Sequence, residues 1–194
     1  MVNVLLGVTG SVAAVKTQAI IDELRKLPFP IQLIVILTKG SEMFVDRSKI
    51  HSADFIYSDD AEYSPETRWN SKGDPVMHID LRRWANVLVI APLTAHTLAK
   101  IASGLCDTLL TCVIRAWEFP DSGPKPIVMF PAMNTAMWEH PLTKRHLGIV
   151  RGLLHAVVVD PAEGKQLACG DTGPGALPEP SEIAETVKKV IERL

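Results

Sequence analysis

The sequence begins with an apolar run that ends in a glycine turn and leads into an amphipathic stretch. Residues Asn3 to Val8 predict a buried strand, and the following Gly10 and Ser11 predict a tight turn and the N-cap of a helix. Pro28 stops that helix before a second apolar run, Ile31 to Leu37. The apolar stripe of the helix is expected on Val12, Val15, Ala19, Ile20, Leu24 and Leu27. This order predicts a βαβ unit with two parallel strands.

The same alternation continues to the end of the chain. Further strands are predicted at Asn86 to Ala91, Ile127 to Phe130 and Ala156 to Val159. Helices are predicted at Ile79 to Trp84, Ala95 to Ala102, Asp107 to Trp117, Leu142 to Leu154 and from a cap at Ser181 onward. Strands alternating with helices indicate the α/β class, with a parallel sheet covered by helices on both faces. With no internal repeat or linker, residues 1–194 are expected to form one domain.

Two stretches lack this regular pattern. Between Thr38 and Asp74 we expect a short helix near Ser41 to Phe44, a short strand around Phe55 and otherwise a long loop. Residues Pro161 to Pro180 are rich in glycine and proline and are expected to be irregular. Long loops in a compact domain tend to be functional.

Composition excludes several classes of protein. The chain is 47% hydrophobic and 22% charged, which is ordinary for a globular domain, and no stretch reaches membrane-spanning length. A formal charge of −2 without a Lys/Arg block gives no reason to expect a nucleic-acid partner. Three cysteines cannot all pair within the chain, and such sparse use is typical of a reducing compartment, so we expect a cytoplasmic protein.

Small polar groups follow the predicted strands. Gly10-Ser11-Val12, Thr38, Thr94-Ala95-His96-Thr97 and Ala132-Met133-Asn134 all come at the carboxyl ends of strands. In doubly wound sheets ligands lie at these ends, and hydroxyl and N–H groups there suit a phosphorylated cofactor. In the alternative interpretation, Ser11 and Thr94 only cap helices. The first segment also lacks the full G-x-G-x-x-G pattern of a dinucleotide site.

Three separated segments each hold a chemically reactive or strongly polar side chain. His78 heads His-Ile-Asp-Leu-Arg-Arg-Trp, Asn134 ends Pro-Ala-Met-Asn, and Cys169 lies in Ala-Cys-Gly-Asp. Each also has a plain structural interpretation: a surface or core histidine, a helix cap and a small buried thiol. Cys169, however, lies in a glycine-rich loop, and imidazole exchanges protons near neutral pH.

These three segments, together with Gly7-Val8-Thr9-Gly10-Ser11, resemble the flavin-dependent cysteine decarboxylases. The resemblance runs from the first strand to the last helix and is densest at residues 78–117 and 131–141. It implies a three-layer, Rossmann-like or flavodoxin-like fold that binds FMN. The implied FMN contacts are Gly10, Ser11, Val12, Thr38, Thr94, Ala95, His96, Thr97 and Ala132. His96 stands where the family usually has asparagine, and an imidazole cannot offer the same donor and acceptor pair.

The resemblance also implies roles for the other segments. His78 would be the active-site base and would face the flavin of an adjacent subunit, so that a homotrimer is the smallest functional unit. Asn134 would hold the substrate carboxylate, and Gln166 and Ala168 would also contact the substrate. Cys169 would donate a proton from a substrate flap around residues 161–180.

The implied reaction is the FMN-dependent decarboxylation of 4′-phosphopantothenoyl-L-cysteine to 4′-phosphopantetheine in coenzyme A biosynthesis. Oxidation of the cysteine end to a thioaldehyde lets the electrons left by carbon dioxide delocalise onto sulfur, and a thiol at Cys169 favours the saturated product. Two alternatives share this fold: a regulatory subunit that inhibits a protein phosphatase, and a flavin prenyltransferase. The presence of His78, Asn134 and Cys169 favours the decarboxylase.

The remaining titratable residues are expected to be structural. His51, His140, His146 and His155 lack metal-ligand spacing, so no metal site is predicted. We expect Cys106 and Cys112 to be buried, and Asp59 and Asp60 to form an exposed acidic pair.

Overall fold

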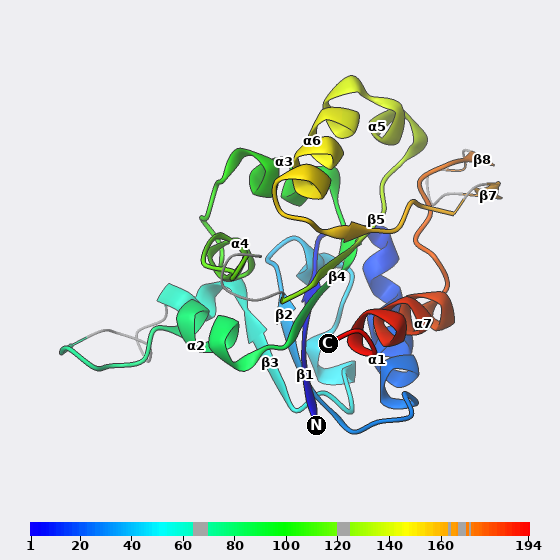
Figure 1. Ribbon diagram of the computed structural model, residues 1–194. Helices are drawn as coiled ribbons and strands as arrows, with labels where there is room; N and C mark the ends of the chain where they lie inside the picture. The colour runs from blue at the N-terminus through cyan, green and yellow to red at the C-terminus, as the bar shows by residue number, and fades with distance from the viewer. Residues whose placement is uncertain (64–69, 120–124, 163, 167–169, 171) are drawn as a thin grey trace.

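The computed structural model describes the chain except residues 64–69, 120–124, 163, 167–169 and 171 (Figure 1). Its main sheet has six strands, all paired in parallel, in the order β3-β2-β1-β4-β5-β6. The strands are β1 Val2–Val8, β2 Ile31–Leu37, β3 Phe55–Ser58, β4 Val87–Leu93, β5 Ile127–Pro131 and β6 Val157–Val158. The order steps outward in both directions from β1, so the strand ends beside β1 and β4 lie where the winding reverses.

The helices cover both faces of this sheet. They are α1 Thr17–Arg25, α2 Met77–Trp84, α3 Ala95–Ser103, α4 Leu109–Arg115, α5 Thr135–Glu139, α6 Pro141–Gly152 and α7 Pro180–Ile191. Short 3₁₀ helices lie at η1 Val12–Lys16, η2 Ser41–Met43, η3 Arg47–Lys49 and η4 Asp59–Tyr63. In Figure 1, α1 and α7 lie together on one side of the sheet, and α2 and α4 lie on the other. The predicted three-layer α/β fold is confirmed.

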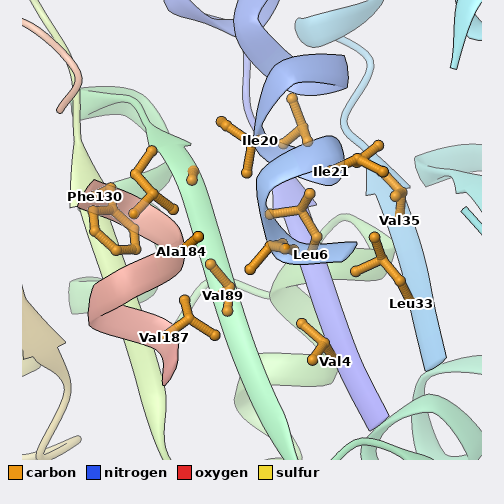
Figure 2. Packing of buried hydrophobic residues seen from close by; sticks show 14 of the residues in the cluster. Val4, Leu6, Ile20, Ile21, Leu33, Val35, Val89, Phe130, Ala184 and Val187 are labelled. Atoms are coloured by element: carbon orange, nitrogen blue, oxygen red, sulfur yellow. The ribbon is translucent and has the colours of Figure 1, made fainter. Parts of the chain in front are cut away.

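Alternating strand residues form two cores. Val4 and Leu6 of β1 point toward α1 and α7, where they pack with Ile20 and Val187 (Figure 2). Leu5 points to the opposite face and belongs to the second cluster, which includes residues of α2, α3 and α4. Burial on both faces explains why the central strands are apolar throughout rather than in alternation.

Several local predictions need correction. The first helix starts as the 3₁₀ helix η1, and Val12 and Val15 are 47% and 64% exposed instead of lying in the core. The last helix starts earlier than predicted, because Glu179 and not Ser181 is its cap. The predicted irregular stretch contains a short antiparallel pair, β7 Lys165–Gln166 with β8 Thr172–Gly173. In the part of the chain that the structure describes, no helix is both long and apolar enough to cross a membrane.

Candidate active site

The loops after β1, β2, β4 and β5 meet at the carboxyl edge of the sheet. Thr38 is buried at the end of β2, and its backbone N–H and its hydroxyl both donate to the Val8 carbonyl of β1, at 3.0 and 3.1 Å. At the end of β5, the Ala132 N–H donates to the Leu93 carbonyl of β4 at 2.9 Å. The predicted cofactor residues Thr38 and Ala132 therefore lie at one edge of the sheet, as expected for a doubly wound fold.

Thr9 joins the β1 loop to the β4 loop. Its buried hydroxyl donates to the Pro92 carbonyl at 2.8 Å and accepts the Thr94 N–H at 2.9 Å. One side chain thus fixes the start of the Thr94–Thr97 segment relative to Gly10 and Ser11. This contact was not anticipated from the sequence, where Thr9 stood out only as part of the glycine turn.

Gly10 is required because the β1 and β2 loops touch through their backbones. A Cβ atom on Gly10 would lie 2.7 Å from the carbonyl carbon of Gly40 and 2.9 Å from its Cα. Real Cβ atoms do not approach backbone atoms this closely, so any side chain would push the two loops apart. The glycine at this turn is therefore explained by the close packing of the two loops.

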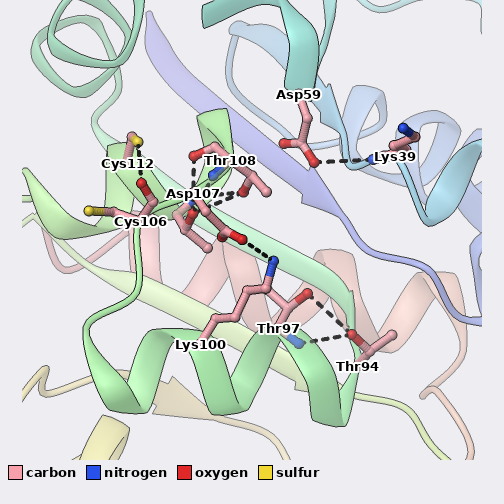
Figure 3. Close-up of polar contacts among 10 residues, drawn as sticks. Lys39, Asp59, Thr94, Thr97, Lys100, Cys106, Asp107, Thr108 and Cys112 are labelled. Carbon is pink, nitrogen blue, oxygen red and sulfur yellow. Dashed lines mark hydrogen bonds and ion pairs between the residues drawn. The ribbon is translucent and has the colours of Figure 1, made fainter.

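The capping interpretation of the hydroxyl residues is confirmed. The Ser11 side chain accepts the Ala13 N–H at 3.3 Å, and the Thr94 side chain accepts the Thr97 N–H at 3.2 Å at the start of α3 (Figure 3). Capping fixes where each hydroxyl lies. The Ser11 hydroxyl proton has no partner among the described residues and can bind a ligand, whereas the Thr94 hydroxyl also donates to the Thr97 hydroxyl at 3.2 Å. The structural and cofactor interpretations are therefore compatible.

A cavity of about 580 Å³ opens between α3, α5 and α6 and contains predicted cofactor and substrate residues together. Ala95 and His96 line it from α3, and Asn134 lines it from the loop after β5. Its other lining residues are Ala99, Ala136, Met137, His140, Leu142, Thr143 and His146. Pockets for cofactors and small ligands typically span about 300–1,000 Å³ and combine apolar walls with a few polar groups. This cavity, beside capped hydroxyls at the strand ends, fits a phosphorylated ring cofactor such as FMN.

Asn134 is the N-cap of α5, and its Oδ1 accepts the Met137 N–H at 2.8 Å. The alternative interpretation, that Asn134 caps a helix, is therefore confirmed for its Oδ1 atom. Asn134 is exposed, and its Nδ2 has no hydrogen-bond partner among the described residues. The cap fixes which way the amide points, and the NH₂ group can donate to an incoming anion.

The described part of the flap is anchored directly beside Asn134. The Met133 N–H donates to the Gly175 carbonyl at 3.0 Å, and the Thr135 hydroxyl donates to the Pro174 carbonyl at 3.0 Å. Gly175 has a φ of +136°, and a Cβ there would lie 2.1 Å from the Met133 oxygen. Cys169, Ala168 and the side chain of Gln166 lie outside the described residues. The structure therefore places their flanking segment but not the groups themselves.

His78 lies in a different region from Asn134. It is in the first turn of α2, where its side chain is 25% exposed and contacts Glu62. In Figure 1, α2 lies at the lower left and α5 at the upper right, well apart. A single chain brings Asn134 together with Ala95 and His96 but does not add His78 to that group.

The burial of Asp59, Cys106 and Cys112 differs from the prediction. Asp59 is only 8% exposed, which corrects its predicted exposure, and it accepts the Lys39 N–H at 3.1 Å (Figure 3). The side chain of Asp60, the other member of the predicted pair, lies outside the described residues. Burial raises the pKa of the Asp59 carboxyl, although the Lys39 hydrogen bond opposes this. Cys106 is exposed and Cys112 partly so, which corrects their predicted burial. Among the residues that are described, no cluster of His, Cys, Asp or Glu could hold a metal.

Comparison with known proteins identifies the family of this chain. The profile of the flavoprotein family matches residues 1–192. A phosphopantothenoylcysteine decarboxylase from Oryza sativa subsp. japonica is 47% identical over 191 residues, covering 98% of this chain and 81% of that protein.

Two solved structures are similarly close. A cysteine-to-serine mutant of PPC decarboxylase complexed with pantothenoylaminoethenethiol superimposes with a TM-score of 0.88 at 45% identity, covering 98% of both chains. The FMN binding protein AtHal3 superimposes with a TM-score of 0.85 at 45% identity, covering 99% of this chain and 97% of the other. The chain therefore belongs to the flavoprotein family, in its phosphopantothenoylcysteine decarboxylase branch.

Proposed function

We propose that this chain is an FMN-dependent enzyme that decarboxylates 4′-phosphopantothenoyl-L-cysteine to 4′-phosphopantetheine, a step of coenzyme A biosynthesis. The observation that carries the proposal is the cavity lined by Ala95, His96 and Asn134, with the described part of the flap anchored beside it. Similar proteins include a phosphopantothenoylcysteine decarboxylase and an FMN binding protein, and the solved structures among them share the fold. The sparse use of cysteine supports a cytoplasmic location.

FMN would be held by the strand-end residues. Gly10, Ser11 and Val12 would contact it from the β1 loop, and Thr38 and Ala132 from the ends of β2 and β5. The α3 start, Thr94 to Thr97, would complete the set. The chemistry that FMN supplies when bound is a reversible two-electron oxidation, and the protein supplies position and protons.

Asn134 would orient the substrate carboxylate through Nδ2. Its Oδ1 is already committed to the Met137 N–H, so the amide cannot rotate without uncapping α5. A neutral donor orients a carboxylate without the strong ionic attraction of an arginine, and this group must leave as carbon dioxide. The fixed amide is therefore suited to binding a carboxylate that is then lost.

Cys169 would donate the proton that completes the saturated product. The support is the position of the flap: Gly173, Pro174 and Gly175 pack on the loop that carries Asn134. Gln166 and Ala168 would contact the substrate from the same flap.

His78 would act as the base on substrate bound in a neighbouring subunit. Its place on α2, apart from the cavity of its own chain, supports a site completed by a second copy. A homotrimer with three equivalent interfaces would give each cavity one His78 in this way.

Asn134→Asp tests the substrate assignment sharply. Aspartate retains the oxygen that caps α5, so the free energy of unfolding should stay within about 0.5 kcal/mol of wild type. A carboxylate facing the substrate carboxylate removes a hydrogen bond to a charged group, so KM should rise about 10- to 100-fold. An unchanged KM would contradict the role of Asn134.

The proposed FMN-dependent activity is tested by the visible absorption spectrum of the purified protein, recorded before and after anaerobic addition of substrate. A yellow preparation whose substrate turns into 4′-phosphopantetheine with release of carbon dioxide supports the proposal. Cys169→Ser should accumulate the oxidised, decarboxylated thiol instead. A colourless preparation that does not take up added FMN would refute the proposal, and a yellow one without turnover would favour a regulatory subunit.

A further inference from the structure

Glu62 contacts His78 at two places. The Nδ1 atom of the His78 ring lies 2.5 Å from Glu62 Oε1, and the backbone N–H of His78 donates to Glu62 Oε2 at 3.0 Å. The Glu62 side chain is only 9% exposed, whereas that of His78 is 25% exposed. A nearly buried carboxylate therefore contacts the inner edge of a ring that remains partly open to solvent.

The backbone contact arises because α2 lacks a cap of its own. Its N-cap residue is Val76, whose side chain cannot accept a hydrogen bond. The first N–H groups of a helix need acceptors, and negative charge is favourable at a helix N-terminus. Glu62, sixteen residues earlier in η4, supplies both an acceptor and a charge. The carboxylate is thus held in place by the fold, independently of the ring.

This arrangement selects one form of the neutral imidazole. An ionised carboxylate only accepts hydrogen bonds, so the ring nitrogen beside it must carry the proton. With the proton on Nδ1, the lone pair of a neutral ring lies on Nε2. The nitrogen that points away from Glu62 is then the one that can take up a proton.

We propose that Glu62 is a positioning residue for catalysis, which fixes the orientation of His78 and keeps Nε2 available as the base. The inference rests on the proposed function, in which His78 removes a proton from the substrate. Glu62 contacts neither substrate nor cofactor in this account and acts only through the ring.

The chain offers a matched control on the same helix. Arg82, one helical turn beyond His78 on α2, is paired with Glu118 at 2.7 Å. Lys125 donates to the Arg82 carbonyl at 3.0 Å and so holds the other end of α2. Glu118→Gln therefore weakens the anchoring of α2 without touching the ring of His78.

Glu62→Gln removes the charge at nearly constant volume, and its amide has only one oxygen. If that oxygen stays on the backbone N–H of His78, the NH₂ group faces Nδ1 and forces the proton to Nε2. The variant is therefore expected to switch the tautomer and to lower kcat about 10- to 100-fold, because a protonated Nε2 is no base. Glu62→Asp keeps the charge and should recover part of the activity.

The tautomer is measured by ¹⁵N NMR of the FMN-loaded protein labelled in its histidines, at a pH where the rings are neutral. His78→Asn assigns the signal among the six histidines. The expected result is a proton on Nδ1 in wild type and in Glu118→Gln, and on Nε2 in Glu62→Gln.

A wild-type His78 protonated on Nε2 would overturn the inference, even if Glu62→Gln failed to fold. So would a Glu62→Gln enzyme with wild-type kcat, or a Glu118→Gln enzyme with an equal loss. Because the tautomer is read without turnover, an inactive wild type with Nδ1 protonated would count against the proposed function alone.

Discussion

The strand-end loops and the surroundings of His78 are built in different ways. The loops at residues 9–12, 38–40 and 132–134 are held by backbone contacts, such as the approach of Gly10 to Gly40 and the bond from Met133 to Gly175. His78 is held by side-chain contacts: Glu62 bonds to its ring and backbone at one end of α2, and Glu118 pairs with Arg82 farther along the helix. Backbone contacts would therefore hold the proposed FMN-binding loops, whereas side-chain contacts would position the proposed base. Substitutions at His78 should therefore affect turnover, whereas substitutions in the strand-end loops should affect FMN binding and stability.

The largest effect is expected from His78→Asn. Without the base, kcat should fall about 10²- to 10⁴-fold, the usual contribution of general base catalysis. The strand-end loops do not involve this residue, so the flavin absorption spectrum and its intensity should stay as in wild type. Turnover and bound FMN are measured on the same preparation. Loss of flavin from this variant would mean that the two regions are not separable.

Gly10→Ala should give the opposite pattern. A methyl group 2.7 Å from the Gly40 backbone must separate two loops, which typically costs about 1–3 kcal/mol in a packed region. We expect FMN to bind about tenfold more weakly or worse, as measured by fluorescence titration of the apoprotein. Gly148→Ala is the control, because nothing lies within 4 Å of a Cβ there. Equal effects of the two substitutions would contradict the close packing.

Thr9→Val tests the bond network between the β1 and β4 loops. Valine has the same shape but leaves the buried Pro92 carbonyl and Thr94 N–H without the Thr9 hydroxyl. The free energy of unfolding, measured with urea, should fall by about 1–2 kcal/mol. Thr186→Val removes an exposed helical hydroxyl and should change stability by less than about 0.5 kcal/mol.

The smallest effect concerns Asp59, between the two regions. Its folded pKa is raised by burial above the ordinary 3.8, so the folded state binds the proton more tightly than the unfolded state. Wild-type stability should therefore fall as pH rises from the unfolded pKa through the folded one. The Asp59→Asn variant lacks this pH-dependent loss. Its free energy of unfolding relative to wild type should therefore increase by less than about 1 kcal/mol between about pH 4 and pH 7, as measured by urea titration.

Asp107→Asn provides a control of opposite sign. A hydrogen bond from Lys100 lowers the pKa of the Asp107 carboxyl, so its contribution is present above the unfolded pKa and lost as pH falls. The free energy of unfolding of Asp107→Asn, relative to wild type, should therefore decrease as pH rises. The same sign for both variants would contradict the burial of Asp59 as the cause.

Sequence patterns predicted the parts of the molecule that depend on local chemistry. The strand at Ile31–Leu37 and the caps at Ser11 and Thr94 follow from apolar runs and hydroxyl positions, and all three are confirmed. Val12 and Val15 were wrongly placed in the core, because a 3₁₀ start turns these side chains away from the stripe of α1. Their exposure at the cofactor edge is visible only in three dimensions.

Glu62 could not have been found from the sequence. It is sixteen residues from His78, in a stretch without periodicity, and no motif joins the two. The partnership depends on the uncapped N-terminus of α2 meeting η4 after folding. The capping role of Asn134 was anticipated as an alternative, and the family resemblance implied its separation from His78 within one chain, which the structure shows.

The central claim, that a cradle and a base from different chains form each site, is tested most directly by subunit mixing. Chains carrying His78→Asn are co-expressed with differently tagged chains carrying Asn134→Asp, and mixed oligomers are purified through both tags. If the site spans two chains of a trimer, the doubly purified mixed trimers should show about a third of the wild-type kcat/KM, because one of their three sites receives both intact residues. Mixed oligomers no more active than the two parent variants would contradict the account.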